Sequence, residues 1–301
     1  MDAAALDAIR IELAPGAALI MPLLLAVVML AVALNLRLSD FAIIKRQPLQ
    51  FAGAAALQLI GLPLLTLGLV YLLEPIASIA LGMIVVACCP GGNVSNLYSH
   101  LAKGDTALSV ALTATSSLFA ALLTPVSIIF WTGLYAPAST LVTEVNINPL
   151  DFIIQTTILL AVPLVIGMGI AARFPKIAAR IRPIFMAASI AALAFLVIAG
   201  LASNWELFTG VALMVLAIAV FHNLSGFALG AIGARVMRFN PRQRRSVTME
   251  VGIQNTGLAL VILLSQFEGL GGAAAITGIW SVWHLFAGAG LAALMRARGH
   301  A

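Results

Sequence analysis

Apolar segments of this chain are interrupted twice by short polar stretches, Pro90-Gly91-Gly92-Asn93-Val94-Ser95-Asn96 and Glu250-Val251-Gly252-Ile253-Gln254-Asn255-Thr256-Gly257. A lipid bilayer offers no water to pair with loose N–H and C=O groups, so irregular backbone at membrane depth survives only inside protein or beside a cavity. When such interruptions recur at corresponding positions in two halves of a membrane protein, they indicate the binding site of a transporter. The two stretches therefore predict two broken transmembrane helices.

The composition is that of a membrane protein. Of the 301 residues, 62% are hydrophobic and only 9% are charged, and the mean hydropathy is +1.10. A soluble domain needs more polar surface than this, so we expect an all-α protein in a lipid bilayer. The isoelectric point near 9.8 is compatible with nucleic-acid binding. The basic residues lie between apolar spans rather than along one face, however, so no nucleic-acid partner is expected.

Nine transmembrane helices are predicted, the longer of which can tilt or break within the bilayer. They run roughly over residues 17–36, 48–73, 76–103, 105–130, 149–172, 183–203, 207–237, 241–267 and 270–297. Lys and Arg accumulate on the cytoplasmic side of membrane proteins. Nine spans place all but Arg10 of the 16 basic residues on one side. The predicted topology therefore has the N-terminus outside and the C-terminus in the cytoplasm, in the inner or plasma membrane of the cell.

The span order predicts two halves of opposite orientation within a single transmembrane domain, residues 1–301. The first repeat covers about 17–130 and the second about 183–297, while the helix at about 149–172 has no partner. In each half, a short first span is followed by a long second, a polar-interrupted third and a long fourth. Such inverted-topology repeats place substrate and coupling ions near the midplane, at discontinuous helices.

Glu250 is the only acidic residue that this assignment places inside the membrane. An ionised carboxylate at that depth costs at least ~2.5 kcal/mol, and no Lys or Arg falls within the predicted interior to pair with it. The carboxylate is therefore either protonated or neutralised by a bound cation. The alternative is an ion pair at the membrane surface with Arg244 and Arg245, although the half-span before Gly252 should carry Glu250 inward.

Neutral oxygen donors accompany Glu250 in the predicted layout. They belong to Gln58, Ser95, Asn96, Ser109, Thr113, Gln254 and Asn255, and to unwound backbone at 251–253. Hard cations prefer oxygen ligands, and a few neutral oxygens with one carboxylate suit a small monovalent ion. A divalent ion usually needs several carboxylates, and a proton-coupled carrier usually has paired intramembrane acids or an acid–Lys pair. Sodium is therefore the predicted ion.

The spacing of Ser109 and Thr113 is i, i+4, so their hydroxyls face one way. The competing interpretation is that each hydroxyl bonds back to its own helix, which is common for Ser and Thr in membranes. In combination with Glu250, the shared direction of the two hydroxyls favours a binding site.

A substrate anion would need positive charge, and no basic side chain reaches the predicted membrane core. Half-helices that begin within the two polar stretches can supply it through their N-terminal dipoles and free N–H groups. We predict that Asn93 and Asn255 cap these half-helices and also face a ligand. His222 and His284 lie in apolar spans, where a place beside a cavity competes with a buried structural role.

Several motifs resemble the bile acid:sodium symporter family. They are Cys88-Cys89-Pro90-Gly91-Gly92-Asn93-Val94-Ser95-Asn96 followed by Leu101-Ala102-Lys103-Gly104-Asp105 and Leu108-Ser109, then Glu250-Val251-Gly252-Ile253-Gln254-Asn255, Ser281-Val282-Trp283-His284 and Leu38-Ser39-Asp40-Phe41. The resemblance covers nearly the whole chain, and its two central motifs are long and specific. It implies a core domain and a panel domain, two discontinuous helices that cross, and alternating access coupled to two transported Na⁺ ions.

The resemblance also implies the roles of individual residues. One sodium site would use Ser95, Asn96, Ser109, Thr113 and Glu250, and a second would use Gln58, Glu250, Gln254 and the backbone carbonyls of Val251 and Ile253. Asn93, Asn255 and His284 would line the substrate cavity. The chain departs from the family pattern at Asn93, where Thr is usual, and at Leu285, where a polar residue often follows His284. Both departures bear on which substrate is carried.

The leading hypothesis is sodium-driven import of an organic anion, either bile-acid-like or a small carboxylate such as pantoate or pyruvate. The alternative is a sodium/proton antiporter on a related inverted-repeat scaffold, against which the lack of paired intramembrane acids counts. An intramembrane enzyme or sensor would need a nucleophile–base set, and the sequence has no such arrangement, so no enzymatic activity is expected. The sequence does not indicate an oligomeric state.

Overall fold

The computed structural model describes residues 7, 17–36, 38–203 and 205–298, and every element within these ranges is helical. The first half of the chain forms α2 (Ala17–Ala33), η1 (Leu38–Phe41), α3 (Ala42–Arg46), α4 (Pro48–Ala56), η2 (Leu57–Gly61), α5 (Leu62–Leu73), α6 (Ala77–Cys88), α7 (Val94–Leu101), α8 (Thr106–Gly133) and α9 (Ala136–Glu144). The second half forms α10 (Pro149–Arg173), α11 (Pro175–Ser203), α12 (Trp205–Val236), α13 (Pro241–Gly252), α14 (Thr256–Gln266) and α15 (Gly271–Ala297). The all-α prediction is confirmed for this part of the chain.

Five of the described helices are long and apolar enough to cross a bilayer. They are Pro48–Leu73, Thr106–Gly133, Pro149–Arg173, Ala212–Val236 and Gly271–Ala297. Shorter apolar helices occupy Met21–Ala33, Ala77–Cys88 and Thr256–Gln266. The long helices indicate an integral membrane protein. Nine crossings remain a prediction, and Arg10 and the two chain ends, on which the predicted orientation depends, lie outside the described residues.

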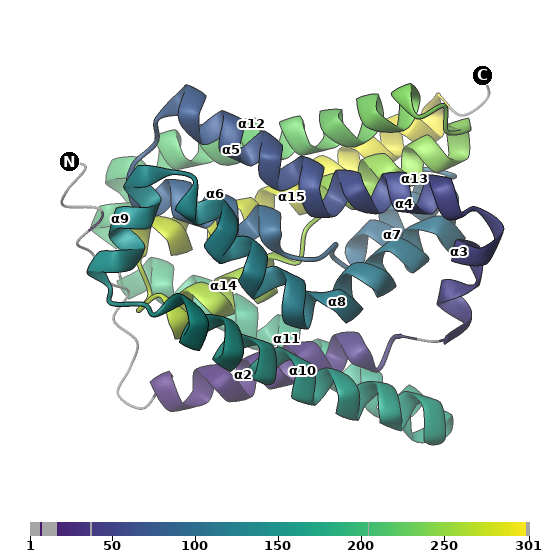
Figure 1. The fold of residues 1–301 in the computed structure, drawn as a ribbon, viewed down its shortest axis with the longest axis horizontal. Helices are drawn as coiled ribbons and strands as arrows, with labels where there is room; N and C mark the ends of the chain where they lie inside the picture. The colour runs from purple at the N-terminus through teal and green to yellow at the C-terminus, as the bar shows by residue number, and fades with distance from the viewer. Residues whose placement is uncertain (1–6, 8–16, 37, 204, 299–301) are drawn as a thin grey trace.

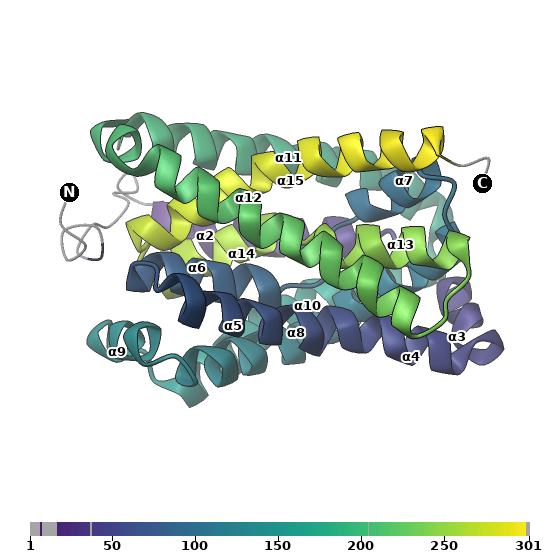
Figure 2. The ribbon, with the colours of Figure 1, turned by 90° about the horizontal axis from the view of Figure 1, so that it is seen from above.

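Two of the expected spans are broken, as the polar stretches predict. The first consists of α6 and α7, and the second of α13 and α14. Figures 1 and 2 show α6 and α14 in one half of the molecule and α7 and α13 in the other, so the two broken segments run in opposite directions. Both breaks are shorter than expected, because only residues 89–93 and 253–255 lie outside helices.

The broken helices are buried at the centre of the fold. Every residue from Ser78 to Cys88 in α6 is buried, and so is most of α14. A helix that is apolar on all sides lies either in lipid or in a protein core, and the burial of α6 and α14 places them in the core. Figure 1 shows α2 and α10 along the lower edge and α4, α5 and α12 along the upper edge, with α6, α7 and α14 between them. Irregular backbone at membrane depth is thus placed inside protein, as it must be.

Small residues allow the central helices to approach closely. A Cβ atom on Gly82 of α6 would lie 2.3 Å from the side chain of Ile276 and 2.7 Å from the backbone oxygen of Ala273, both on α15. Transmembrane helices associate through such close packing because lipid gives no hydrophobic force between them. This contact fixes α15 against the first broken helix.

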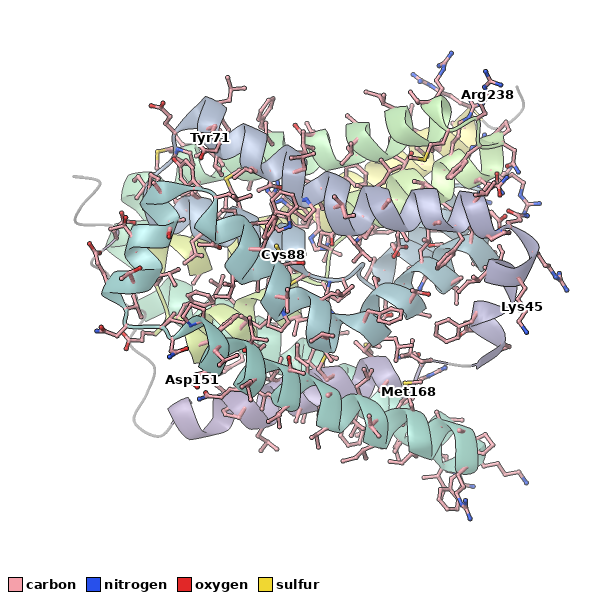
Figure 3. The ribbon with its side chains drawn as sticks, in the orientation of Figure 1. Lys45, Tyr71, Cys88, Asp151, Met168 and Arg238 are labelled. Carbon is pink, nitrogen blue, oxygen red and sulfur yellow. The ribbon has the colours of Figure 1, made fainter. Side chains whose placement is uncertain are left out.

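Charged residues gather at opposite ends of the molecule. In Figure 3, Lys45 and Arg238 lie at one end, whereas Asp151 and Tyr71 lie at the other. The sequence-based topology assigns Lys45 and Arg238 to the inner face and Asp151 to the outer face, so the arrangement of these residues agrees with that assignment.

Three features differ from the sequence-based expectation. Helix α11 begins at Pro175 rather than near 183, because proline is well suited to the first turn of a helix and the basic residues that follow continue it. A short helix, α9, occupies the connection before α10. The π-helix η2 interrupts the second span, with Leu62 N–H bonding to Leu57 O, five residues earlier.

Candidate functional site

The two helix breaks pair with each other through their backbones. Gly92 N–H donates to Ile253 O at 3.0 Å, and Asn255 N–H donates to Pro90 O at 2.8 Å. These bonds flank an antiparallel bridge between Gly91 and Gln254. Groups that a broken helix leaves unpaired at membrane depth are therefore satisfied by the other broken helix. This pairing explains why both breaks are so short.

Glu250 lies beside this crossing, near the end of α13, and is only 1% exposed. Its Oε2 atom is 2.6 Å from Ser95 Oγ and 3.2 Å from Ser109 Oγ, and its Oε1 atom is 2.8 Å from Thr113 Oγ1. Ser95 lies in the first turn of α7, whereas Ser109 and Thr113 lie one turn apart on α8. Two helices, α7 and α8, thus bring hydroxyl groups to one buried carboxylate on a third helix, α13.

Asn96 completes this group of oxygens, which we call the Glu250 cluster (Ser95, Asn96, Ser109, Thr113 and Glu250). Asn96 Oδ1 lies 2.9 Å from Ser109 Oγ and 3.2 Å from Thr113 Oγ1. The sequence predicted all five members. It missed Ser99, whose hydroxyl donates to Ser109 Oγ at 3.0 Å. The i, i+4 spacing of Ser95 and Ser99 is the signal that could have identified it.

The alternative interpretation of Glu250, an ion pair at the membrane surface, is wrong. Arg244 Nε donates to Phe239 O at 2.6 Å, and Arg245 Nη1 donates to Ala102 O at 2.9 Å. Both guanidinium groups therefore bond to backbone carbonyls, while the Glu250 carboxylate turns to the hydroxyl groups.

A second group of polar atoms contacts the backbone of Glu250, around Gln58 and Gln254. These two side-chain amides are 2.9 Å apart, and both are buried. In the amide orientation that best satisfies its neighbours, Gln58 donates to Glu250 backbone O at 2.9 Å and accepts from Gly91 N–H at 3.2 Å. Gln58 lies within the π-helix, a rare element that is frequent at functional sites.

The carbonyl groups at 251–253, expected to be free, each accept a hydrogen bond. Val251 O accepts from Gln254 Nε2 at 2.9 Å, and Ile253 O accepts from Gly92 N–H at 3.0 Å. Gly252 O accepts from Asn223 Nδ2 at 2.7 Å. A carbonyl oxygen has two lone pairs, so each retains one acceptor position. Sequence reasoning missed Asn223, although an asparagine within an apolar span was a usable signal.

The two asparagines expected at the substrate cavity differ in their capping. Asn255 Oδ1 accepts from Leu258 N–H at 3.1 Å and caps α14, as predicted. Asn93 makes no side-chain cap bond to α7, so its predicted capping role is wrong. Its φ and ψ, −54° and −23°, are already helical, whereas a capping residue needs extended backbone to turn its side chain toward the first N–H groups. Both asparagines are partly exposed.

The two membrane histidines are buried in helix packing. His284 stacks on Trp280 with a ring-centroid distance of 4.9 Å, and its Nδ1 atom is 2.8 Å from Trp280 O. His222 Nε2 lies 2.8 Å from Thr66 Oγ1. These contacts agree with the structural interpretation of both residues, and the structure does not test the role of His284 in a substrate cavity.

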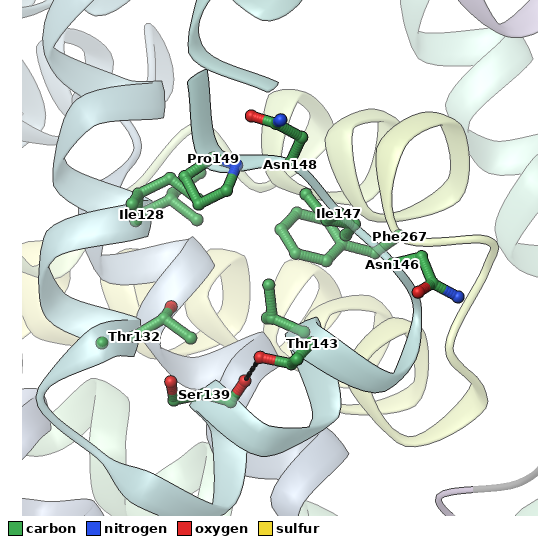
Figure 4. A pocket seen from close by; sticks show the side chains of 12 residues that line it. Ile128, Thr132, Ser139, Thr143, Asn146, Ile147, Asn148, Pro149 and Phe267 are labelled. Atoms are coloured by element: carbon green, nitrogen blue, oxygen red, sulfur yellow. Dashed lines mark hydrogen bonds between the residues drawn. The ribbon is translucent and has the colours of Figure 1, made fainter. Parts of the chain in front are cut away.

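One cavity of about 430 Å³ lies away from these residues, between α8, α9 and the start of α10 (Figure 4). Its lining combines apolar side chains such as Ile128 and Phe267 with neutral polar ones such as Thr132 and Asn148. None of the predicted site residues lines it. This cavity is therefore separate from the candidate site.

Replacement of Thr113 by Val should lower the free energy of unfolding by about 1–3 kcal/mol, because the Glu250 carboxylate loses a buried hydroxyl partner. Thr115, two residues further along α8, is the matched control, since its buried Oγ1 has no hydrogen-bond partner among the described residues. Thr115→Val should leave stability unchanged or raise it. Thermal unfolding of both purified variants provides the comparison, and equal stability of the two would contradict the assigned contacts.

Comparison with known proteins points to one family. The model of the Sodium Bile acid symporter family matches residues 22–211. Over 268 residues the chain is 31% identical to the uncharacterized sodium-dependent transporter YocS of Bacillus subtilis (strain 168), a match that covers 89% of this chain and 80% of that protein.

Two eukaryotic relatives are also similar. Identity is 29% over 268 residues with the probable chloroplastic sodium/metabolite cotransporter BASS1 of Oryza sativa subsp. japonica, and 31% over 246 residues with sodium/bile acid cotransporter 4 of Homo sapiens. These matches cover 89% and 81% of this chain, but only 64% and 55% of the relatives. The chain therefore spans little more than half the length of its longer relatives.

Proposed function

Because this chain belongs to the Sodium Bile acid symporter family, we propose that it is a symporter that imports a small organic anion together with sodium by alternating access. The observation that carries the proposal is a carboxylate, Glu250, buried among neutral oxygens at the crossing of two broken helices. Family members are sodium-dependent transporters rather than enzymes, so we propose no catalytic activity.

The first proposed sodium site is the Glu250 cluster. Each of its three hydroxyl groups can donate only one hydrogen bond. Ser109 and Thr113 nevertheless each lie within hydrogen-bonding distance of acceptor oxygens on both Glu250 and Asn96, so some of these acceptors receive no proton. Spare lone pairs therefore converge on one point, and such oxygens suit a hard cation. A single carboxylate balances the charge of one monovalent ion. No described Lys or Arg forms an ion pair with Glu250, so a cation is the partner that the charge requires.

The second proposed sodium site lies around the backbone of Glu250. It would use Gln58, Glu250, Gln254 and the carbonyl groups of Val251 and Ile253. Support comes from the 2.9 Å contact between the two Gln amides and from the lone pair that each carbonyl retains. Because both sites share Glu250, binding of the two ions would be coupled.

The proposed substrate site lies at the half-helix starts. Helices α7 and α14 begin at Val94 and Thr256, directly after Asn93 and Asn255. The N-terminal end of a helix carries partial positive charge, which supplies the attraction that no basic side chain provides there. Asn93, Asn255 and His284 are the proposed contacts, and the relatives' names, which mention bile acid and metabolite, suggest an organic acid.

We further propose the architecture that this mechanism needs. The repeats at about 17–130 and 183–297 would be inverted relative to each other, with α10 unpaired and nine crossings in all. A core domain would hold the two broken helices and move against a panel domain. The separation of Lys45 and Arg238 from Asp151 supports an N-terminus outside and a C-terminus inside the cell.

Uptake by proteoliposomes tests the proposed function. With an inward sodium gradient, vesicles holding the protein should accumulate at least one of taurocholate, pantoate and pyruvate, and replacement of sodium by potassium should abolish this uptake. A screen of these acids by thermal shift, with and without sodium, selects the compound to use. Uptake that is equal without sodium would refute sodium coupling. Exchange driven by a pH gradient alone, with no organic acid, would indicate a sodium/proton antiporter.

A further inference from the structure

A second candidate site lies at the shared end of helices α7 and α13, where a cavity of about 470 Å³ opens. The residues that define its chemistry are His100, Lys103, Thr106, Pro241, Arg242 and Arg245. Three of these side chains are cationic and one is an imidazole. None of them belongs to the sodium or substrate sites proposed above, so those sites do not account for their clustering.

Within the described residues, no carboxylate pairs with the three cations. Lys103, Arg242 and Arg245 form no ion pair with any residue in the described part of the chain. The nearest acidic group in sequence, Asp105, accepts a hydrogen bond from Leu108 N–H at the start of α8. Asp105 lines a neighbouring cavity instead of this one. The cavity therefore presents a concentrated positive charge that repels itself unless an anion is present.

The walls of the cavity are held in place by hydrogen bonds. Arg245 Nη1 donates to Ala102 O at 2.9 Å, and Ser246 Oγ donates to Asp105 O at 2.8 Å. Asp105 N–H donates to Arg242 O at 3.1 Å. The turn between α7 and α8 is thus bonded to the first turn of α13, and the cations do not depend on a mobile loop for their positions.

The packing at Gly104 draws these two segments together. A Cβ atom on Gly104 would lie 2.6 Å from Ser246 Oγ and 3.0 Å from Ser99 O, so only glycine fits without displacement. Helices α8 and α13 both begin at the cavity, at Thr106 and Pro241, and their N-terminal ends add partial positive charge. The same two segments lead directly into the Glu250 cluster.

We propose that this cavity binds a phosphate group, carried either by an anionic lipid headgroup or by a soluble phosphate compound. Phosphate presents several strong acceptor oxygens and up to two negative charges, which match two Arg guanidinium groups and one Lys ammonium group. The cavity lies on the side to which the topology assigns the cytoplasm, where the membrane surface carries anionic lipids. A bound phosphate would join the α7–α8 turn to α13 and stabilise the crossing above it.

Ligand-dependent thermal unfolding of the purified protein, in sodium-free buffer of constant ionic strength, tests this proposal. The probes are short-chain phosphatidic acid, inorganic phosphate and, as a carboxylate dianion, succinate. The site variant is Lys103→Asn/Arg242→Gln/Arg245→Gln, in which Asn suits the left-handed backbone of residue 103. The matched control, Arg173→Gln/Lys176→Gln/Arg180→Gln, removes the same charge from exposed residues assigned to the same face.

We expect at least one phosphate probe to raise the Tm of the wild type and of the control by about 3 °C or more, and neither probe to raise that of the site variant. A response to lipid alone identifies a headgroup, and a response to both probes identifies phosphate itself. No response of the wild type, equal loss in the control, or an equal effect of succinate would overturn the proposal. If the triple variant does not fold, Arg242→Gln alone, which changes an exposed side chain, should weaken the response.

Discussion

Glu250→Gln is expected to abolish the stabilisation of this protein by sodium. The substitution keeps the shape of the side chain but removes the only negative charge in the Glu250 cluster. Neutral oxygens alone do not offset the hydration free energy that a cation loses when it enters a buried site. We expect the sodium dissociation constant to rise by a factor of about 100 or more, which corresponds to about 2.7 kcal/mol of binding free energy.

The same variant should behave differently without sodium. Without sodium, a buried carboxylate carries an uncompensated desolvation cost, which Glu250→Gln removes. The Tm of the variant should therefore equal or exceed that of the wild type. Sodium titrations followed by thermal unfolding provide the measurement, with Glu144→Gln, an exposed acid on α9, as the control. Glu144→Gln should retain the full sodium response. Wild-type sodium affinity in Glu250→Gln would remove Glu250 from both proposed sites.

Gly91→Ala is expected to weaken sodium binding by displacing the Glu250 carboxylate. A Cβ atom on Gly91 would lie 2.1 Å from Glu250 Oε1, a distance that real Cβ atoms do not show, and 3.0 Å from Glu250 Cδ. The carboxylate must therefore move away from Ser95 and Thr113, or the paired breaks must separate. Overpacking of this kind lowers the free energy of unfolding by about 1–3 kcal/mol, and we expect sodium affinity to fall by a factor of about ten or more.

A glycine that makes no such contact is the control for this variant. Gly290 on α15 is exposed, and a Cβ atom there would meet nothing within 4 Å. Gly290→Ala should therefore change neither stability nor sodium affinity appreciably. Thermal unfolding at several sodium concentrations measures both quantities in one experiment. If Gly91→Ala retains the wild-type sodium response, the Glu250 carboxylate does not bind sodium from the position that it has in this structure.

Local patterns in the sequence were sufficient to predict the helical segments and to single out Glu250 with its candidate oxygen ligands, whereas the grouping of the five residues of the Glu250 cluster came from the family resemblance. Long apolar runs identify the helices, and the i, i+4 spacing of Ser109 and Thr113 places both hydroxyls on one face of α8. A lone acid between two polar breaks then has few possible neighbours. Hydropathy also identified both broken helices, although their ends differ by several residues from the prediction.

Two of the missed features depend on contacts between separate segments. The bond from Asn223 to Gly252 O joins two helices, and no periodicity in either one reports it. The shortness of the breaks results from their mutual pairing, which the sequence of one break alone does not contain. The wrong prediction for Asn93 has a local cause that only the structure reveals, namely a backbone that is already helical before α7 begins.

The antiparallel bridge between Gly91 and Gln254 also restricts how the chain can change in length. Side chains alternate between opposite faces along paired backbones, so a shift of one residue in either break exchanges the two faces. One inserted or deleted residue between Cys89 and Asn93 would then turn the Gly91 position away from Glu250 and bring a side chain toward it. Surface loops accept insertions readily, but both breaks should not. A relative whose aligned sequence has a gap at either break would therefore have a different ion site.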